Sequence, residues 1–271
     1  MQAIKVVENL YCIEGRGFDS NIYVIIDEDR KAMLVDCGTG LYFNQLLNTL
    51  DKLNVDLKNI KCIILTHMHF DHSGGVVKLL ERSSIDVLAH KIDAKYLEEG
   101  DDEYVFAWGF GAKLKPIKIS AYLEEGNNIN FGDFNFKVLH TPGHTKGSIC
   151  LYDEERKILL SGDTVFAGGG VGRFDLPSGS LRDLINSLEK LSKIKVDKLL
   201  PGHGKIVTED GNLHIKLALD WINTKILNNI KFIFPVPLIS CLFLLAFLRI
   251  FSSFAYMLSL KFSLLQIARL I

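Results

Sequence analysis

The segment that follows Leu65 concentrates side chains able to bind metal. Three imidazoles and one carboxylate occur within the six residues from His67 to His72, directly after the apolar run KCIIL. His67 and His69 are two residues apart, so in an extended chain their side chains point to the same side and can bind one ion. Asp71 and His72 lie where the chain turns toward a predicted helix, SGGVVKLLER, and are free to bind a second ion. The spacing therefore predicts a strand-to-helix turn that holds two metal ions.

Three further candidate ligands occur later in the chain in similar surroundings. His144 follows the strand-like run FNFKVL, Asp163 follows KILL, and His203 follows VDKLL. Each of the three is preceded by a glycine, which permits a tight turn at the end of a strand. Functional residues of α/β folds gather where strands end. We therefore expect all of these side chains to meet at one shared sheet edge.

The order of these motifs resembles the metallo-β-lactamase superfamily. The pattern H-x-H-x-D-H, then His, Asp and His within TPGHT, SGDT and PGHG, extends the resemblance over residues 4–222, and Asp36 in LVDCGTG matches a structural acidic residue of the family. The loop GRFDLPSGS, residues 172–180, resembles that of short type II glyoxalases and persulfide dioxygenases. The resemblance implies an α/β (α+β) fold, a four-layer αββα sandwich, followed here by a hydrophobic helical tail.

The resemblance also implies a role for each site residue. Asp71 is expected to act catalytically by orienting the attacking hydroxide, besides binding metal. Arg173 matches a lysine that binds the glutathione part of the substrate in type II glyoxalases. Seven metal ligands are implied, with His67, His69 and His144 on the first metal, Asp71, His72 and His203 on the second, and Asp163 bridging the two.

Two Zn²⁺ ions are the expected cofactor. With two carboxylates and a bridging hydroxide the site stays net positive, which stabilises an oxyanion and lowers the pKa of water. The expected function is hydrolysis of a small thioester or related acyl substrate, as in hydroxyacylglutathione hydrolases. Because imidazole and carboxylate also suit Fe²⁺ or a mixed zinc, iron and manganese centre, a mono-iron persulfide dioxygenase-like oxidoreductase is one alternative. A membrane-tethered, non-catalytic metal-binding protein is the other.

Composition separates a catalytic domain, residues 1–224, from the tail. The chain has 271 residues and a formal net charge of −1, which offers no signal for binding nucleic acid. No signal peptide precedes the first predicted strand, and the five cysteines form no CxxC pair, so we expect a cytoplasmic domain with reduced thiols. Trp108 and Phe110 are candidates for a substrate pocket, with core packing as the alternative.

Apolar runs predict the elements that position the site. Residues 91–126 are expected to form a helix and a loop over the site. The remaining predictions are strands near 4–7, 10–14, 21–27, 31–35, 61–66, 135–140, 147–152, 157–161 and 197–200, with helices near 41–53 and 180–193.

The tail, residues 225–271, contains an uncharged run, 232–248, whose length as a helix falls slightly short of the hydrocarbon core of a bilayer. A thin polar stripe follows it, typical of a helix in the membrane interface. The tail is therefore a candidate membrane anchor, with packing in a homo-oligomer or a frameshift as alternatives. It lacks the basic stretch with which type II glyoxalases bind glutathione, which favours a different thioester.

Overall fold

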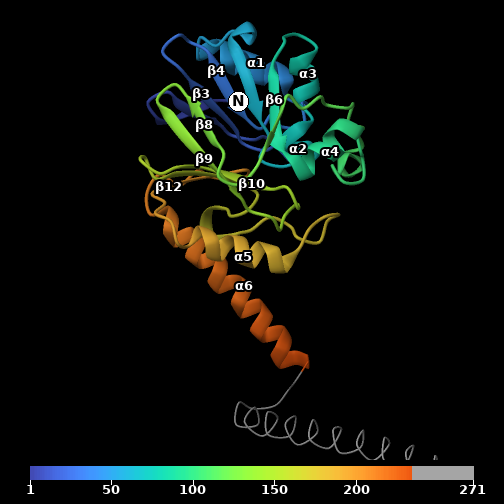
Figure 1. The fold of residues 1–271 in the computed structure, drawn as a ribbon, viewed down its shortest axis with the longest axis vertical. Helices are drawn as coiled ribbons and strands as arrows, with labels where there is room; N and C mark the ends of the chain where they lie inside the picture. The colour runs from blue at the N-terminus through green and yellow to red at the C-terminus, as the bar shows by residue number, and fades with distance from the viewer. Residues whose placement is uncertain (234–271) are drawn as a thin grey trace, which may run out of the picture. The chain divides into compact units, whose positions relative to one another are not determined.

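The computed structural model describes residues 1–233, and the side chains of residues 1–224. The chain divides after Ile222, and the first compact unit is Met1–Ile222. Two β-sheets form the centre of this unit, with helices on their outer faces (Figure 1). The predicted sandwich is confirmed.

The first sheet has seven strands in chain order among the described residues. Its first four strands form an antiparallel meander, and the next three join in parallel through helical crossovers. The strands are β1 (Ala3–Val7), β2 (Leu10–Ile13), β3 (Ile22–Ile26), β4 (Ala32–Val35), β5 (Ile60–Ile64), β6 (Asp86–His90) and β7 (Ala121–Leu123).

The second sheet has five strands in the order β12-β11-β10-β9-β8. Neighbours are antiparallel except for β11 and β12, which are parallel, so β9, β11 and β12 all run in the same direction. The strands are β8 (Asn128–Phe131), β9 (Phe134–His140), β10 (Ile149–Asp153), β11 (Ile158–Gly162) and β12 (Lys198–Pro201).

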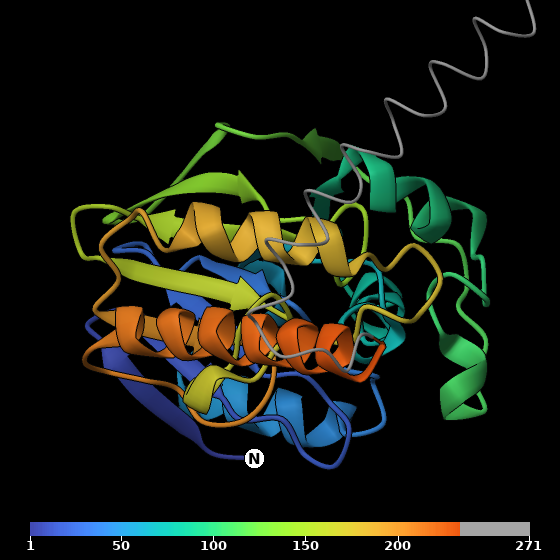
Figure 2. The same cartoon turned by 90° about the horizontal axis from the view of Figure 1, so that it is seen from below.

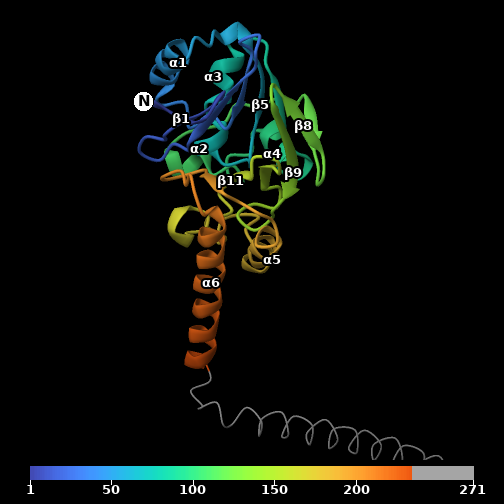
Figure 3. The same cartoon turned by 90° about the vertical axis from the view of Figure 1, so that its left-hand side faces the viewer.

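Helices cover both sheets. Helices α1 and α3 lie on the outer face of the first sheet, and α5 lies on the outer face of the second, beside the part of α6 that ends at Ile222 (Figures 2 and 3). The α-helices are α1 (Phe43–Lys52), α2 (Phe70–Ser73), α3 (Val76–Leu80), α4 (Lys91–Glu99), α5 (Leu181–Leu191) and α6 (Gly211–Ile233), and the 3₁₀ turns are Leu57–Asn59, Ala107–Phe110 and Ala167–Gly169.

Strand β3 shows why the sheets pack in layers. All five of its side chains are buried. Alternate residues point to opposite faces, so Val24 packs among the residues beneath the helices, whereas Tyr23 and Ile25 join the cluster between the two sheets. The same cluster holds Phe136 and Leu160 of the second sheet. A strand that is apolar on both faces therefore specifies a layer with neighbours on each side.

The predicted elements are confirmed with small shifts at their ends. Residues 91–126 contain α4 and the turn Ala107–Phe110 as expected, but they also supply β7 at an edge of the first sheet. Strands β6 and β8 were not predicted. Strand β6 has three apolar residues between Asp86 and His90, and β8 alternates exposed asparagines with apolar residues, so neither has the longer apolar run that marks a buried strand.

Among residues 1–233, none of the helices combines the length and the apolar character needed to cross a bilayer. The apolar run at 232–248 and the polar stripe after it fall almost entirely outside the described residues. The boundary between residues 224 and 225 and the membrane attachment of the tail therefore stay predictions.

We expect Phe136→Ala to lower the free energy of unfolding by about 3–5 kcal/mol, because it leaves a cavity between the sheets. Phe136 is fully buried, whereas Phe18 is 80% exposed. The matched variant Phe18→Ala should change the stability by less than about 0.5 kcal/mol. Urea denaturation of both variants measures the difference, and equal losses would contradict this account of the core.

Candidate metal centre

The seven predicted metal ligands lie close together at one end of the sandwich. One strand of the first sheet and three strands of the second end there. His67, His69, Asp71 and His72 follow β5 of the first sheet, and the last two lie within α2. His144 follows β9, Asp163 follows β11 and His203 follows β12, all in the second sheet. The prediction of a single sheet edge is therefore wrong. Strands of both sheets end at the same side, and the packing of the sheets brings the two edges together.

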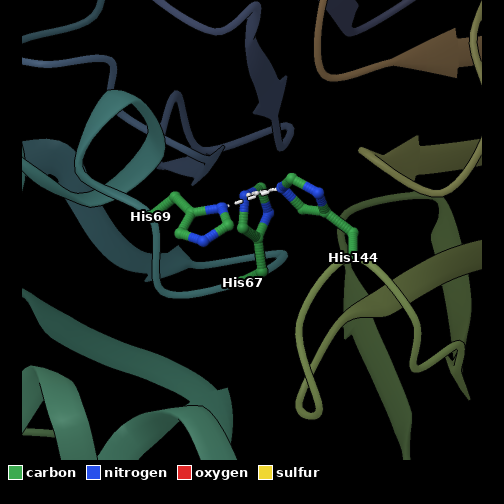
Figure 4. Close-up of side chains that lie close together, drawn as sticks. All are labelled: His67, His69 and His144. Atoms are coloured by element: carbon green, nitrogen blue, oxygen red, sulfur yellow. Dashed lines mark hydrogen bonds between the residues drawn. The ribbon is translucent and has the colours of Figure 1, made fainter. Parts of the chain in front are cut away.

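Three imidazoles form the first group, within which the ligand atoms lie no more than 4.8 Å apart. His67 and His69 extend from the turn after β5, and His144 reaches them from the loop after β9 (Figure 4). The His144 Nε2 atom lies 2.8 Å from His69 Nδ1 and 3.1 Å from His67 Nε2. Ligand nitrogens around a tetrahedral zinc ion are about 3.4 Å apart, since each Zn–N bond is about 2.0–2.1 Å long. The two separations from His144 Nε2 are shorter than this by about 0.3 to 0.6 Å, so the three nitrogens are close enough to one another to bind one ion.

The second group contains Asp71, His72 and His203. The His203 Nε2 atom lies 3.1 Å from Asp71 Oδ2 and 3.2 Å from His72 Nε2. Asp163 lies between the two groups, since its two carboxylate oxygens are 3.3 Å from His72 Nε2 and 3.5 Å from His144 Nε2. This placement is the one expected of a bridging ligand.

The partner of its other ring nitrogen decides which nitrogen of His144 carries a proton. The His144 Nδ1 atom lies 2.6 Å from the carbonyl oxygen of Arg173, and only N–H can donate to a carbonyl, so Nε2 carries the lone pair. Burial and neighbouring imidazoles hold the pKa of His67 and of His69 well below the ordinary value. Burial also lowers the pKa of His144. All three rings are therefore neutral near pH 7 and able to bind metal.

Two carboxylates add negative charge to this set of candidate ligands. Burial by itself raises the pKa of Asp163, but the imidazoles of His72 and His203 outweigh burial and hold it well below its usual range. The pKa of Asp71 is lowered in the same way, because His72 and His203 outweigh burial. Burial lowers the pKa of His72, but the carboxylates of Asp36 and Asp163 dominate and hold it well above the ordinary value. The donor set therefore contains two ionised carboxylates at neutral pH.

Buried polar atoms without hydrogen-bond partners indicate what the site binds. Among the described residues, three buried side-chain atoms have no hydrogen-bond partner: Ser20 Oγ, His69 Nε2, on the ring side away from the His144 contact, and Asp163 Oδ1, which lies within the cluster. An unpaired buried polar atom costs about 1–3 kcal/mol. The unpaired Asp163 Oδ1 atom, which lies 3.3 Å from His72 Nε2, is accounted for if a cation binds beside it, so the residues present fit a centre of metal ions. Gly202 assists this approach, because a Cβ atom there would overlap Asp163 Oδ1.

Asp36 orients the turn that carries the ligands. Its carboxylate accepts hydrogen bonds from the backbone N–H and the hydroxyl of Thr66, at 2.9 and 2.8 Å, and lies 2.8 Å from His72 Nδ1. The contact holds the Nδ1 proton and directs His72 Nε2 toward the cluster, as carboxylates commonly do for ligating histidines. Asp36 adopts a φ of 61°, an uncommon conformation that is held by these bonds.

The sequence offered no signal for Asp93, which lies in α4 and joins the two metal-binding loops. One carboxylate oxygen accepts from the Met68 backbone N–H at 3.0 Å and from the Thr145 hydroxyl at 2.7 Å. The other oxygen accepts from the Gly147 backbone N–H at 2.8 Å. Asp93 therefore connects the turn of His67 and His69 to the loop of His144. A lone aspartate in a helix has no distinguishing pattern, so only the tertiary contacts reveal this role.

A second connection joins the first sheet to the loop of His203. The Tyr23 hydroxyl donates to the Pro201 carbonyl oxygen at 2.6 Å, and the Asn21 side chain donates to the carbonyl oxygens of Pro201 and Gly204, both at 2.9 Å. These buried hydrogen bonds fix the position of His203 relative to the first sheet.

Arg173 lies at the wall of a cavity of about 650 Å³ above the cluster. The cavity is also lined by His69, Asp71 and Asp163, so the candidate ligands form part of its surface. The Arg173 guanidinium donates to both carboxylate oxygens of Asp175, at 3.0 and 2.9 Å. Its predicted role in binding substrate stays a prediction. Of the two aromatic candidates, Phe110 lines the cavity, whereas Trp108 is 62% exposed and packs on Phe106.

Residues 15–203 match the Metallo-beta-lactamase superfamily. This span includes all seven candidate ligands. The chain belongs to the metallo-β-lactamase superfamily. The superfamily resemblance drawn from the motifs is thus confirmed.

Two relatives of this metallo-β-lactamase superfamily chain carry the names of thioester hydrolases. Hydroxyacylglutathione hydrolase GloC of Haemophilus influenzae is 31% identical over 202 residues, which cover 74% of this chain and 92% of that protein. Acyl-coenzyme A thioesterase MBLAC2 of Homo sapiens is 30% identical over 226 residues, covering 72% and 78%. Among solved structures, the di-iron-bound form of TTHA1623 is similar, with 30% identity, a TM-score of 0.61 and coverage of 78% of this chain and 96% of that one.

The Asp93 carboxyl generates a pH-dependent prediction. Burial raises its pKa from 3.8 to about 6, although its three hydrogen bonds act in the opposite direction. The folded state therefore holds this proton more tightly than the unfolded state, and its contribution to stability is lost as the pH rises from about 4 to about 6. Asp93→Asn cannot ionise, so its destabilisation should be larger at pH 4 than at pH 7, by about 2 kcal/mol.

Urea denaturation of wild type and Asp93→Asn at the two pH values measures this difference. Asp29→Asn is the control, because its exposed carboxylate is paired with Lys31, which lowers the pKa of Asp29. The loss of unfolding free energy caused by Asp29→Asn should be small, and it should be slightly larger at pH 7 than at pH 4. A cost of Asp93→Asn that is independent of pH would contradict the prediction.

Proposed function

We propose that this protein is a metal-dependent hydrolase that cleaves a small thioester or a related acyl substrate. The observation that carries the proposal is the cluster of closely spaced imidazole nitrogens and buried carboxylates at the wall of a cavity of about 650 Å³. Such cavities are large enough for a small-molecule substrate. The names of GloC and MBLAC2 favour a thioester over other carbonyl substrates.

The proposed metal ligands are those predicted from the motifs. His67, His69 and His144 would hold one ion, Asp71, His72 and His203 the other, and Asp163 both. Two bound divalent ions would supply positive charge for an oxyanion and lower the pKa of water. We propose zinc as the metal. Iron is the alternative, because the similar protein TTHA1623 has a di-iron-bound form.

The protein's own groups orient the reaction. Asp71 lines the cavity as an ionised carboxylate, so it can accept a hydrogen bond from the attacking water and direct it toward the substrate carbonyl. The oxygen of water bonds to the carbonyl carbon, the carbon–sulfur bond breaks, and the products are a carboxylic acid and a thiol. The fixed positions of the imidazoles mean that little reorganisation is needed when charge develops.

A second candidate function rests on a different grouping of the same residues. His67, His72 and Asp163 bring their ligand atoms within 4.8 Å of one another. Two histidines and one carboxylate with open positions are typical of non-haem Fe(II) oxygenases. A mono-iron persulfide dioxygenase-like oxidoreductase is therefore the alternative. Metal content and oxygen uptake separate the two, because a dioxygenase needs about one iron per chain and consumes O₂, whereas a hydrolase does not consume O₂.

We expect His69→Ala to lower thioester hydrolysis by the zinc-loaded protein by at least about 100-fold, because a metal ligand is lost. His214→Ala is the matched control, since His214 lies outside the cluster and accepts a hydrogen bond from the Gly168 backbone. Hydrolysis is followed by release of free thiol, with circular dichroism to show that both variants fold. Activity unaffected by His69→Ala would overturn the proposal, and a loaded protein inert toward thioesters, lactones and persulfides would favour a non-catalytic metal-binding protein.

Attachment of the chain to a membrane through residues 225–271 is kept as a separate proposal, supported by the uncharged run at 232–248. The full chain should then float with lipid vesicles in a density gradient, whereas residues 1–224 should not. Flotation of neither protein would exclude the anchor.

A further inference from the structure

The cavity above the metal cluster is apolar on its outer walls. His69, Asp71, Asp163 and the other candidate ligands occupy one part of its surface. Facing them are seven apolar side chains from four separate segments of the chain: Phe18, Leu41, Phe106, Phe110, Phe166, Val171 and Leu176.

The aromatic wall is attached to the metal-binding turn. The Phe70 backbone N–H, next to His69, donates to the Val105 carbonyl oxygen at 2.8 Å. The following residue, Phe106, has a φ of 60°, a conformation that bulky side chains rarely adopt. Its ring lies with its centroid 6.5 Å from that of His69, and Gly109 makes room for it, because a Cβ atom there would overlap the ring. The backbone thus places an aromatic surface beside the first metal group.

Two of these apolar side chains are largely exposed to solvent. Phe18 is 80% exposed and Leu41 is 73% exposed. Large apolar side chains gathered at the mouth of a cavity are typical of a surface that binds an apolar ligand. Phe18 contacts Phe110 edge to face, with ring centroids 6.3 Å apart, so this exposed ring continues the aromatic wall.

The charges in the cavity do not favour a polar acyl group. Among the described residues that line it, Arg173 is the one lysine or arginine, and its guanidinium is bound by Asp175. The carboxylates of Asp71 and Asp163 belong to the proposed metal centre. A hydroxyl or carboxylate on the acyl chain would therefore meet the phenyl and aliphatic walls and lose its bonds to water.

We infer that this site selects thioesters with an apolar acyl group, aliphatic or aromatic, over short hydroxyacyl groups such as lactoyl. The inference rests on the proposed hydrolysis for its chemistry, whereas the selectivity follows from the walls. The carbonyl carbon lies at the metal cluster, the acyl chain packs along Phe106 and Phe110, and Phe18 and Leu41 cover its outer end. The thiol extends out of the cavity.

The first test varies the acyl group on one neutral thiol. Octanoyl, acetyl and lactoyl thioesters of N-acetylcysteamine are compared with the zinc-loaded full chain. We expect kcat/KM for octanoyl to exceed that for lactoyl by at least about tenfold, because each buried methylene favours binding. Equal or reversed values overturn the inference while leaving the hydrolase function intact. A second series keeps the octanoyl group and changes the thiol. If kcat/KM changes more in this series than in the acyl series, the inference is overturned as well.

The second test removes the exposed walls. Leu41→Ala and Phe18→Ala should each lower kcat/KM for octanoyl by about fivefold to tenfold and lower that for lactoyl by less, since the longer acyl chain loses more apolar contact area. Leu213→Ala is the matched control, because Leu213 is also exposed, at 52%, and does not line the cavity. Equal losses for octanoyl and lactoyl, or the same loss in Leu213→Ala, would contradict the proposed packing.

A binding measurement separates this inference from the proposed function. The S-octyl thioether of N-acetylcysteamine cannot be hydrolysed, so calorimetry reports its affinity without turnover. Tighter binding than the S-ethyl thioether, weakened by Leu41→Ala, supports the inference even if no thioester is cleaved. Equal binding of the two thioethers overturns it, whatever the hydrolysis assays give.

Discussion

The electrostatic balance among buried imidazoles and carboxylates is the constraint on which the rest of this structure depends. Neutral ring nitrogens of His67, His69 and His144 face each other at distances suited to ligands of one ion. Asp163 sits among the imidazoles with one oxygen unpaired. A buried carboxylate oxygen without a partner is unfavourable unless a cation binds to it. The same arrangement of atoms is what a bound metal ion requires, so metal binding would offset the free energy lost by burying them.

That arrangement persists because residues outside the cluster hold it. Asp36 fixes the ring of His72 through Nδ1, and Asp93 joins the turn of His69 to the loop of His144. Tyr23 binds the Pro201 carbonyl oxygen beside His203. Each of these groups is buried and each crosses between chain segments that are far apart in sequence. The site is therefore as rigid as the contact between the two sheets, which is what preorganised electrostatic catalysis demands.

The cavity adds a second kind of specificity to this polar centre. Its metal-binding wall is polar, whereas the walls built by Phe106, Phe110 and the exposed Phe18 and Leu41 are apolar. A substrate that fits both surfaces has a polarised carbonyl next to an apolar chain. The GRFDLPSGS loop contributes Arg173 to the cavity wall. Because the Arg173 guanidinium is paired with Asp175, Arg173 attracts an anionic substrate group less strongly.

The amino-acid sequence by itself determined the family, the sandwich and the identity of the candidate ligands. The spacing of His67, His69, Asp71 and His72 is local, and each later ligand follows an apolar strand and a glycine, so short-range patterns are enough to find them. Strands β6 and β8 escaped prediction because β6 has only three apolar residues between two polar ones and β8 alternates asparagines with apolar residues. Only the tertiary structure decided that two sheet edges share the site, because that depends on packing between strands distant in sequence. The same holds for Asp93 and for the apolar cavity walls, whose partners come from separate segments and leave no local pattern.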